Sequence, residues 1–264
     1  MGLSLRSRLV VLMLAAIVPL FGLSLGKTWL NQQAAVSRTA GNLEFSASLV
    51  AASQSRMVDS AHQILAAIAH APGLLEDKSA DCAHYLHTLK QQLGSYANLG
   101  LVGLDGYIVC HAMAARPNVY VGDRRYIQET LQRRRFTVGG YTLGRMTGKP
   151  VITFSMPVMN AQGQPKALAF VSIDLQEVAR PLLSPALPQG GRVIILDRQG
   201  LVLAVNPPDP GIIGQPAPDA VLQQGVKTMR PGSAEGLDDQ GRPQLYSFLP
   251  AGREGGEAAF LVGV

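Results

Sequence analysis

The chain opens with a long apolar segment that carries no charge. Leu9–Gly26 is a run of 18 uncharged, mainly apolar residues, preceded by Arg6 and Arg8 and followed by Lys27. A helix of roughly 20 such residues crosses a bilayer, and positive charge ahead of it keeps the N-terminus in the cytoplasm. A signal peptide normally has a shorter apolar core and a small-x-small cleavage site. We therefore predict an uncleaved membrane anchor over residues 1–30.

The next segment has the pattern of a long helix. Over residues 31–71, alanine, serine and aliphatic residues recur without a proline before Pro72. A helix of about 40 residues would be about 60 Å long, which is unusual inside a globular domain. We predict a stalk that rises from the membrane and packs along a domain. The stalk suggests a parallel homodimer, although no clean heptad is present. A second helix is predicted over Ala80–Leu93.

The rest of the chain contains one strand pattern twice. Apolar runs flank Asp105–Gly106, which is a hairpin signal, and similar runs flank Asp197–Gly200. The segment GKPVITFSMP at Gly148–Pro157 is matched by GRPQLYSFLP at Gly241–Pro250. The two pairs are offset by 92 and 93 residues. A constant offset indicates a duplicated domain.

These patterns define the predicted organisation. An anchor over residues 1–30 and a stalk helix over residues 31–71 precede two tandem lobes with antiparallel sheets, over residues 72–182 and 183–264. The fold class is therefore α+β.

The repeat also decides how the stretch GRMTGKP, residues 144–150, is interpreted. Only three residues separate its glycines and a proline follows Lys149, so the spacing and the missing hydroxyl do not fit a P-loop. Because GKP recurs as GRP at residue 241, we interpret it as a turn that leads into a strand.

One predicted strand, Val151–Val158, has two different faces. Ile152 and Phe154 share one face, whereas Thr153 and Ser155 share the other. The hydroxyl face could line a polar pocket, but the pattern alone favours an exposed sheet face. The later run ALAFVSID is almost continuously apolar, which predicts a central strand.

Composition and charge narrow the class of protein. Apolar residues make up 47% of the chain, which is enough to form a sizeable core. There are 23 Lys+Arg against 18 Asp+Glu, a net charge of +5. The arginines at 133–135 are typical of a solvated helix face, because nucleic-acid binding needs a basic stripe, ideally with interleaved aromatics. No nucleic-acid partner is predicted.

The two cysteines have two interpretations. If the chain beyond the anchor lies in an oxidising compartment, Cys82 and Cys110 are expected to form a disulfide. His84, His87 and His111 lie close to them in the sequence, which raises metal binding as the alternative. The spacing matches no standard zinc pattern, so the sequence favours the disulfide over a metal site.

A charged helix start lies between the repeated units, in the stretch VYVGDRRYIQETL. Asp123 is predicted to cap the helix, with Arg124, Arg125 and Tyr126 in the first turn. A helix start favours an anion, and an arginine there can hold a carboxylate through two hydrogen bonds. The alternative, favoured by pattern alone, is a surface ion pair for Arg124 and a core position for Tyr126.

The chain resembles the double Cache, or PAS-like, extracytoplasmic sensor domain of bacterial histidine kinases, diguanylate cyclases and chemoreceptors. The resemblance rests on the anchor, the long helix, the two strand-rich lobes and the run GDRRYIQETL…GKPVITFSMPV…SIDL, and it covers nearly everything after about residue 30. It implies that residues 72–182 form a membrane-distal, ligand-binding lobe and residues 183–264 a membrane-proximal one. Some members also carry a similarly placed cysteine pair.

The resemblance also implies a set of ligand-binding residues. Arg124 stands where dicarboxylate-sensing relatives place their arginine, but Arg125 replaces the proline of that pattern. Tyr126 and Ile127 depart from the Trp-Tyr pair of amino-acid-sensing relatives. The implied site residues are Tyr120, Arg124, Tyr126, Tyr141, Thr153, Ser155 and Asp174.

The predicted function is that of the input domain of a receptor in the bacterial inner membrane, with its sensor part in the periplasm. A small organic acid is the expected ligand. An amino-acid or amine sensor and a ligand-free dimerisation or interaction module are the alternatives. No catalytic residue, cofactor or metal is predicted, and an envelope hydrolase would need a nucleophile–base pair for which no motif is found. The output domain is expected beyond the last strand, in a longer relative.

Overall fold

The computed structural model describes residues 40–71, 73–74, 79–113, 119–183, 190–238 and 240–264. The predicted anchor over residues 1–30 and the first part of the predicted stalk lie outside these residues. Among the helices that are described, none is long and apolar enough to cross a membrane.

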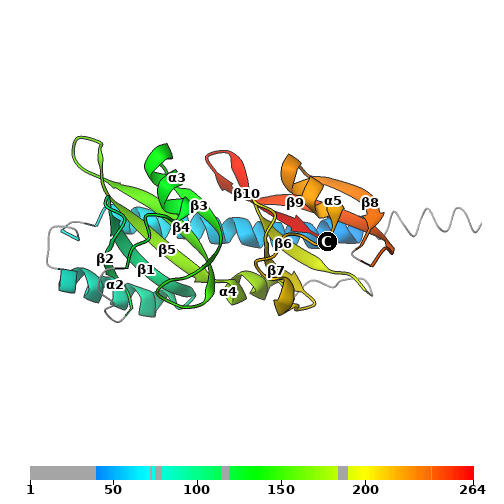
Figure 1. The fold of residues 1–264 in the computed structure, drawn as a ribbon, viewed down its shortest axis with the longest axis horizontal. Helices are drawn as coiled ribbons and strands as arrows, with labels where there is room; N and C mark the ends of the chain where they lie inside the picture. Colours follow the sequence, from blue (N-terminus) through cyan, green and yellow to red (C-terminus); the bar gives the residue numbers. More distant parts are fainter. Residues whose placement is uncertain (1–39, 72, 75–78, 114–118, 184–189, 239) are drawn as a thin grey trace, which may run out of the picture. The chain divides into compact units, whose positions relative to one another are not determined.

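The N-terminal helix is described over residues 40–69. Its buried positions recur every three or four residues, which is the period of one helix face. From residue 43 onward this face packs into one hydrophobic core with strands of both sheets described below (Figure 1). The predicted long helix is therefore confirmed over its described part. The buried residues are Leu43, Ser46, Ala47, Val50, Ala51, Gln54, Val58, Ala61, Leu65 and Ile68.

The first lobe is built around a five-stranded antiparallel sheet with the strand order β2-β1-β5-β4-β3. The central strand is β5, which contains the ALAFVSID run, as predicted. The elements are α2 Ser79–Leu93, β1 Tyr96–Gly103, β2 Ile108–His111, α3 Arg125–Arg133, β3 Thr137–Leu143, β4 Pro150–Met159 and β5 Pro165–Asp174.

The second lobe repeats this plan in the order β7-β6-β10-β9-β8. Each lobe places a helix, α3 or α5, between its second and third strands. The predicted repetition of one strand plan is thus confirmed. The elements are α4 Leu175–Ala179, η1 Arg180–Leu183, β6 Val193–Asp197, β7 Val202–Asn206, η2 Pro210–Ile212, α5 Ala220–Thr228, β8 Gly232–Leu237, β9 Pro243–Glu254 and β10 Glu257–Gly263.

The GKP stretch is a turn between two strands. Gly148 has a φ of 66° and precedes β4, and Gly241 has a φ of 76° and precedes β9 at the equivalent place. A positive φ favours glycine at both positions, because a Cβ atom would strain this conformation. No helix follows Gly148 directly, so the interpretation as a strand-entry turn is confirmed.

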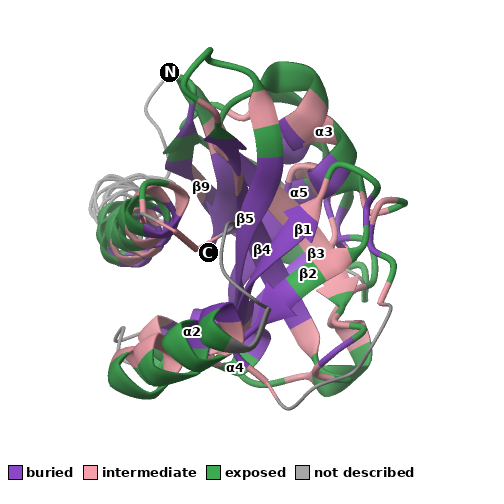
Figure 2. Cartoon of the chain, turned by 90° about the vertical axis from the view of Figure 1, so that its left-hand side faces the viewer, coloured by how far each residue is buried: buried purple, intermediate pink, exposed green. Residues whose placement is uncertain are grey.

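Both faces of the first sheet are covered, which corrects one prediction. Thr153 and Ser155 are 1% and 0% exposed, so the hydroxyl face of β4 is not the exposed face that its pattern favoured. The reason is that α3 lies across it: the Ser155 hydroxyl donates to the Tyr126 carbonyl at 3.3 Å and is also hydrogen-bonded to the Thr130 hydroxyl. Figure 2 shows the strands β1, β4 and β5 buried, whereas the outward side of α2 is exposed.

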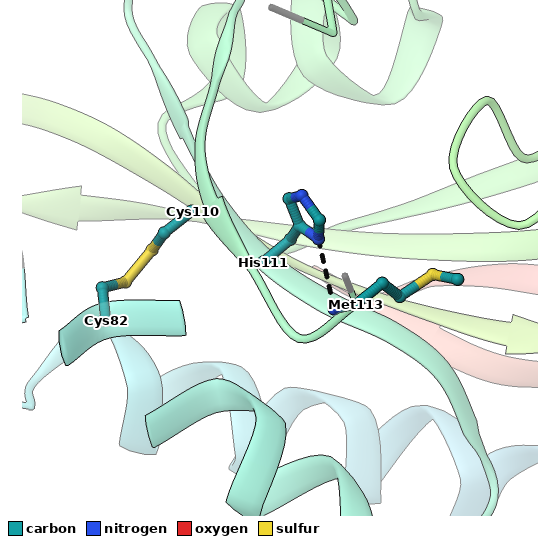
Figure 3. The surroundings of a disulfide bond; sticks show 4 residues. All are labelled: Cys82, Cys110, His111 and Met113. Carbon is teal, nitrogen blue, oxygen red and sulfur yellow. Dashed lines mark hydrogen bonds between the residues drawn. A yellow bond between two sulfur atoms is a disulfide. The ribbon is translucent and has the colours of Figure 1, made fainter. Parts of the chain in front are cut away.

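Cys82 and Cys110 form a disulfide that joins α2 to the edge strand β2 (Figure 3). Their Cα atoms lie 6.1 Å apart, within the usual range for a bridge. The prediction of a disulfide is confirmed. Because both sulfur atoms belong to this bond, neither cysteine is available as a metal ligand. No group of three or more potential metal ligands is found among the described residues.

Acidification is expected to destabilise the fold through His111. Burial lowers the pKa of this imidazole from 6.5, and its Nδ1 accepts a hydrogen bond from the Met113 N–H at 3.2 Å (Figure 3). Because the pKa is lower in the folded than in the unfolded chain, this contribution to stability is complete above pH 6.5. It is lost as the pH falls from there toward the folded-state pKa, by at most about 1.4 kcal/mol per pH unit.

Urea unfolding of the wild type and of His111→Asn between pH 8 and pH 5 measures this effect. The asparagine side chain keeps an acceptor for Met113 but does not titrate, so the difference in stability between the two proteins should shrink as the pH falls. His87, which is hydrogen-bonded to the Ala112 carbonyl, is present in both proteins, so it does not contribute to the difference between them. The matched control is His84→Asn on the exposed side of α2. Parallel pH profiles for wild type and His111→Asn would contradict the prediction.

Candidate functional site

A buried row of polar side chains crosses three strands of the first sheet. Asn98 on β1 and Thr153 on β4 both pair with Ser172 on β5, from opposite sides. All three are at most 7% exposed, and the Thr153 and Ser172 hydroxyls lie 2.9 Å apart. Buried polar groups are costly unless they are hydrogen-bonded, so such a row on an otherwise apolar sheet points to a polar site. Asn98 and Ser172 were not among the predicted site residues, because only the strand register aligns them with Thr153.

Arg124 lies at the start of α3, above this row. It occupies the N-cap position with φ −73° and ψ 132°. Its guanidinium donates to the Thr142 hydroxyl at 2.9 Å and to the Leu143 carbonyl at 3.0 Å. These contacts tie the beginning of α3 to the end of β3. Both acceptors are uncharged, so the positive charge of Arg124 is held here by neutral groups.

Asp123 was predicted to be the helix cap, and this prediction is wrong. The Asp123 carboxylate instead accepts two hydrogen bonds from the Arg145 guanidinium, each 2.6 Å long. The paired fork of the guanidinium matches a carboxylate better than a single backbone N–H does. The hydrogen bond from Arg145 lowers the pKa of Asp123, and the same bond raises the pKa of Arg145. The Arg145 guanidinium also donates to the Tyr120 carbonyl.

The Tyr126 hydroxyl is a neutral group at physiological pH. Burial raises the pKa of Tyr126 to about 12, although the nearby Arg124 and a hydrogen bond with Thr153 act in the opposite direction. A phenol that stays protonated can donate a hydrogen bond to a ligand. It therefore supplies a donor beside the Arg124 guanidinium.

These side chains surround a small cavity, which we call the first-lobe cavity. Its volume is about 30 Å³, close to the share of a single water molecule in the liquid. In this packing it has no room for an organic ligand. Its lining includes Asn98, Ile108, Arg124, Tyr126, Thr142, Arg145, Met146, Thr153, Phe170 and Ser172.

A larger hollow, which we call the interlobe cavity, lies where the two lobes meet. Its volume is about 320 Å³. One wall is formed by α3 and β3 of the first lobe, and the other by the β6–β7 turn and the β9–β10 hairpin of the second. Arg124, Tyr126 and Thr142 line both cavities, so the two are separated by shared side chains.

The structure brings three of the predicted site residues together at the first-lobe cavity: Arg124, Tyr126 and Thr153. Tyr141 lies instead at the interlobe cavity, where its ring packs against Gly214 and its N–H donates to Asp197 at 2.9 Å.

The other three predicted residues lie outside the lining of both cavities. The Tyr120 ring packs against Tyr107 with centroids 5.1 Å apart. Ser155 is held by α3, as described above. Asp174 caps α4 by accepting from the Gln176 N–H at 3.0 Å, and pairs with Lys149 at 3.2 Å. Each of these side chains therefore has a partner within the protein.

No protein-family model matches the sequence, and no curated protein sequence matches it. Solved structures do match. The extracellular domain of rpHK1S-Z16, which is named as a histidine kinase, aligns with a TM-score of 0.73 at 16% identity, over 87% of this chain and 94% of that one. The ligand-binding domain of a Pseudomonas fluorescens chemoreceptor in complex with L-isoleucine aligns with a TM-score of 0.67 at 15% identity, over 88% and 94%.

A third match is the ligand-binding domain of an amino acid chemoreceptor of Pseudomonas aeruginosa PAO1 in complex with GABA. It aligns with a TM-score of 0.62 at 19% identity, over 86% of this chain and 98% of that one. The chain thus has the fold of the extracellular ligand-binding domains of histidine kinases and chemoreceptors, the double Cache type. The resemblance read from the sequence is confirmed at this level.

Proposed function

We propose that this chain is the extracytoplasmic sensor part of a membrane signal-transduction receptor, and that it binds a small organic anion in the first lobe. The observation that carries the proposal is the Arg124 guanidinium, held by two neutral oxygens above a buried polar row. A ligand carboxylate can replace those oxygens with charge-assisted hydrogen bonds, which are roughly twice as strong as neutral ones. The Tyr126 hydroxyl and Thr153 would bind the rest of the ligand.

Binding requires a change of packing, because the first-lobe cavity holds about one water molecule. The segment from Leu143 to Thr147 forms part of its wall, and this segment would have to move away from the sheet. A ligand acts by preferring the expanded packing over the closed one. The N-terminal helix shares a core with both lobes, so it is the element that would carry the change toward the predicted anchor.

The remaining features of the receptor belong to the same proposal. The predicted anchor would place the sensor in the periplasm, and a parallel homodimer would form through the N-terminal helix. Among the predicted site residues, we assign positioning roles to Tyr120, Tyr141, Ser155 and Asp174, because each is bonded to or packed on another part of the protein. The domain itself is proposed to be non-catalytic.

An amino acid is the second candidate ligand. Two of the similar structures are complexes with GABA and L-isoleucine. In this chain Asp123, which precedes Arg124 directly, would be the carboxylate for an ammonium group, but Arg145 already occupies it. An organic acid without an amine therefore fits the charges of the site better.

The expected result is that Arg124→Ala abolishes ligand-induced stabilisation. Thermal unfolding is followed with a panel of organic acids, amino acids and amines. A true ligand at about 100 times its Kd adds roughly 2.7 kcal/mol to the free energy of unfolding, which is on the order of 5–10 °C in Tm. Because the anchoring guanidinium is lost, the shift should disappear in Arg124→Ala.

Arg180→Ala is the matched control, since Arg180 forms an exposed ion pair with Glu177 and lines neither cavity. It should keep the full shift. An unchanged shift in Arg124→Ala would overturn the assignment of Arg124. A flat panel in folded protein would favour the ligand-free interaction module instead.

A further inference from the structure

We propose that the interlobe cavity is a second binding site, which takes a small di- or tricarboxylate and bridges the two lobes. This inference goes beyond the proposed function, which concerns the first-lobe cavity alone, and it can hold or fail independently of it.

The interlobe cavity is large enough for a small organic acid. At about 320 Å³ the interlobe cavity has roughly ten times the volume of the first-lobe cavity. It corresponds to about ten water molecules and lies within the range of small-molecule pockets, about 300–1,000 Å³. A molecule of the size of succinate or citrate can enter it without the expansion that the first-lobe cavity needs.

Two arginines converge on one buried carboxylate at this cavity. Glu254 on β9 is fully buried and accepts from Arg133 of the first lobe at 3.2 Å and from Arg198 of the second at 2.9 Å. Both arginines line the interlobe cavity. Two guanidinium groups, one from each wall, thus share a single carboxylate, so neither has a carboxylate of its own here.

The α3 wall of the cavity supplies further hydrogen-bond donors. In the described residues, Arg125 commits its Nε to Glu129 at 2.6 Å and Arg133 commits one nitrogen to Glu254. A guanidinium has five N–H donors in a rigid fork, and that geometry matches carboxylates. A ligand rich in carboxylate oxygens therefore meets the remaining N–H donors of Arg125 and Arg133, while the lining carboxylates Asp123 and Glu129 are paired with Arg145 and Arg125.

The opposite wall contributes a third lining carboxylate, Glu257, whose charge would oppose such a ligand. This residue is exposed at the start of β10. Its charge makes a directional test possible: removing the Arg125 charge should weaken the binding of an anion, and removing the Glu257 charge should strengthen it. Both side chains are at the surface, so neither substitution is expected to unfold the protein.

The experiment is a calorimetric titration of the full chain with succinate and with citrate at physiological ionic strength. We expect Arg125→Ala to weaken the binding of at least one of the two acids about tenfold, since a hydrogen-bonded charge is lost. Glu257→Gln is expected to tighten it severalfold. Thr153→Val changes the lining of the first-lobe cavity only, because Thr153 does not line the interlobe cavity. It should therefore leave this binding unchanged, as should the surface control Arg180→Ala.

Several results would overturn the proposal. It is wrong if neither acid binds, or if Arg125→Ala and Glu257→Gln both bind as the wild type does. If Thr153→Val abolishes the binding and Arg125→Ala does not, the acid occupies the first-lobe cavity. That outcome supports the proposed function and removes the second site. A ligand shift that is lost in Thr153→Val, with no binding of succinate or citrate, would do the same, because Thr153 lines the first-lobe cavity and not the interlobe cavity.

Discussion

Glu254→Ala is expected to lower the free energy of unfolding by about 2–4 kcal/mol, because it removes the acceptor of a buried backbone donor and of two partly exposed guanidinium groups. The Glu254 side chain is fully buried and holds groups from both lobes. One oxygen accepts from Arg133, and the other accepts from Arg198 at 2.9 Å and from the Val138 N–H at 3.0 Å. Alanine would leave two guanidinium groups and a buried backbone donor without this acceptor.

The location of these partners makes the effect larger than that of an ordinary ion pair. Val138 lies on β3, the edge strand of the first sheet. Its N–H would otherwise have to find water at a buried position, because Val138 is only 6% exposed. Tyr141, further along the same strand, donates to a second buried carboxylate, Asp197, at 2.9 Å. Two backbone N–H groups at the edge of the first sheet, those of Val138 and Tyr141, thus donate to carboxylates of the second lobe.

Urea unfolding at neutral pH measures the predicted loss. Glu254→Gln, which keeps the shape and an acceptor for Val138 but not the charge, should lose less than Glu254→Ala. Glu235→Ala is the matched control, since Glu235 is exposed on β8 of the same sheet and a surface change of this kind stays within about 0.5 kcal/mol. A Glu254→Ala protein as stable as the control would refute the role assigned to this carboxylate.

Removing the disulfide is the second change with a large expected effect. Cys82 and Cys110 are 28 residues apart in sequence. In the chain-entropy description, closing a loop of this length in the unfolded state stabilises the fold by about 3–4 kcal/mol. The bridge also fixes α2 to β2, an edge strand of only four residues whose neighbour in the sheet is β1. We therefore expect the double variant Cys82→Ser, Cys110→Ser to lose about that amount of stability.

The measurement compares the wild type and the double variant in urea, each with and without a strong reductant. Reduction should destabilise the wild type to about the level of the double variant and leave the double variant unchanged. The disulfide contributes less stability than the chain-entropy description predicts under either of two results. The first is that reduction leaves the urea midpoint of the wild type unchanged. The second is that the double variant unfolds at the same urea concentration as the wild type.

Several features of this protein follow from the sequence alone, because each depends on residues that are neighbours in the chain. The N-terminal helix is visible in the spacing of its apolar residues and in the absence of proline. The hairpin at Asp105–Gly106 and the turns at Gly148 and Gly241 are set by local backbone preferences. The repeated strand plan is visible because its two copies keep a nearly constant offset. The run ALAFVSID marks the central strand, since both of its faces are covered.

The candidate site was predicted only in part. Arg124, Tyr126 and Thr153 were expected there and do meet at the first-lobe cavity. Asn98 and Ser172 were not expected, because the sequence around a polar residue in an apolar strand does not indicate which strand will pair with it. The burial of Ser155 was missed for a similar reason: a strand pattern gives the alternation of its faces, but not which element covers each face.

The partners of charged groups were decided by the tertiary structure alone. Asp123 pairs with Arg145, 22 residues away, and Arg133 pairs with Glu254, 121 residues away. No local pattern links such positions, because the contact exists only after the sheets have formed and the lobes have met. Electrostatic pairing depends on distance in space and on burial, whereas sequence patterns report the periodicity of one element at a time. The elements of this protein were therefore determined by its sequence, and the site between them by the way they pack.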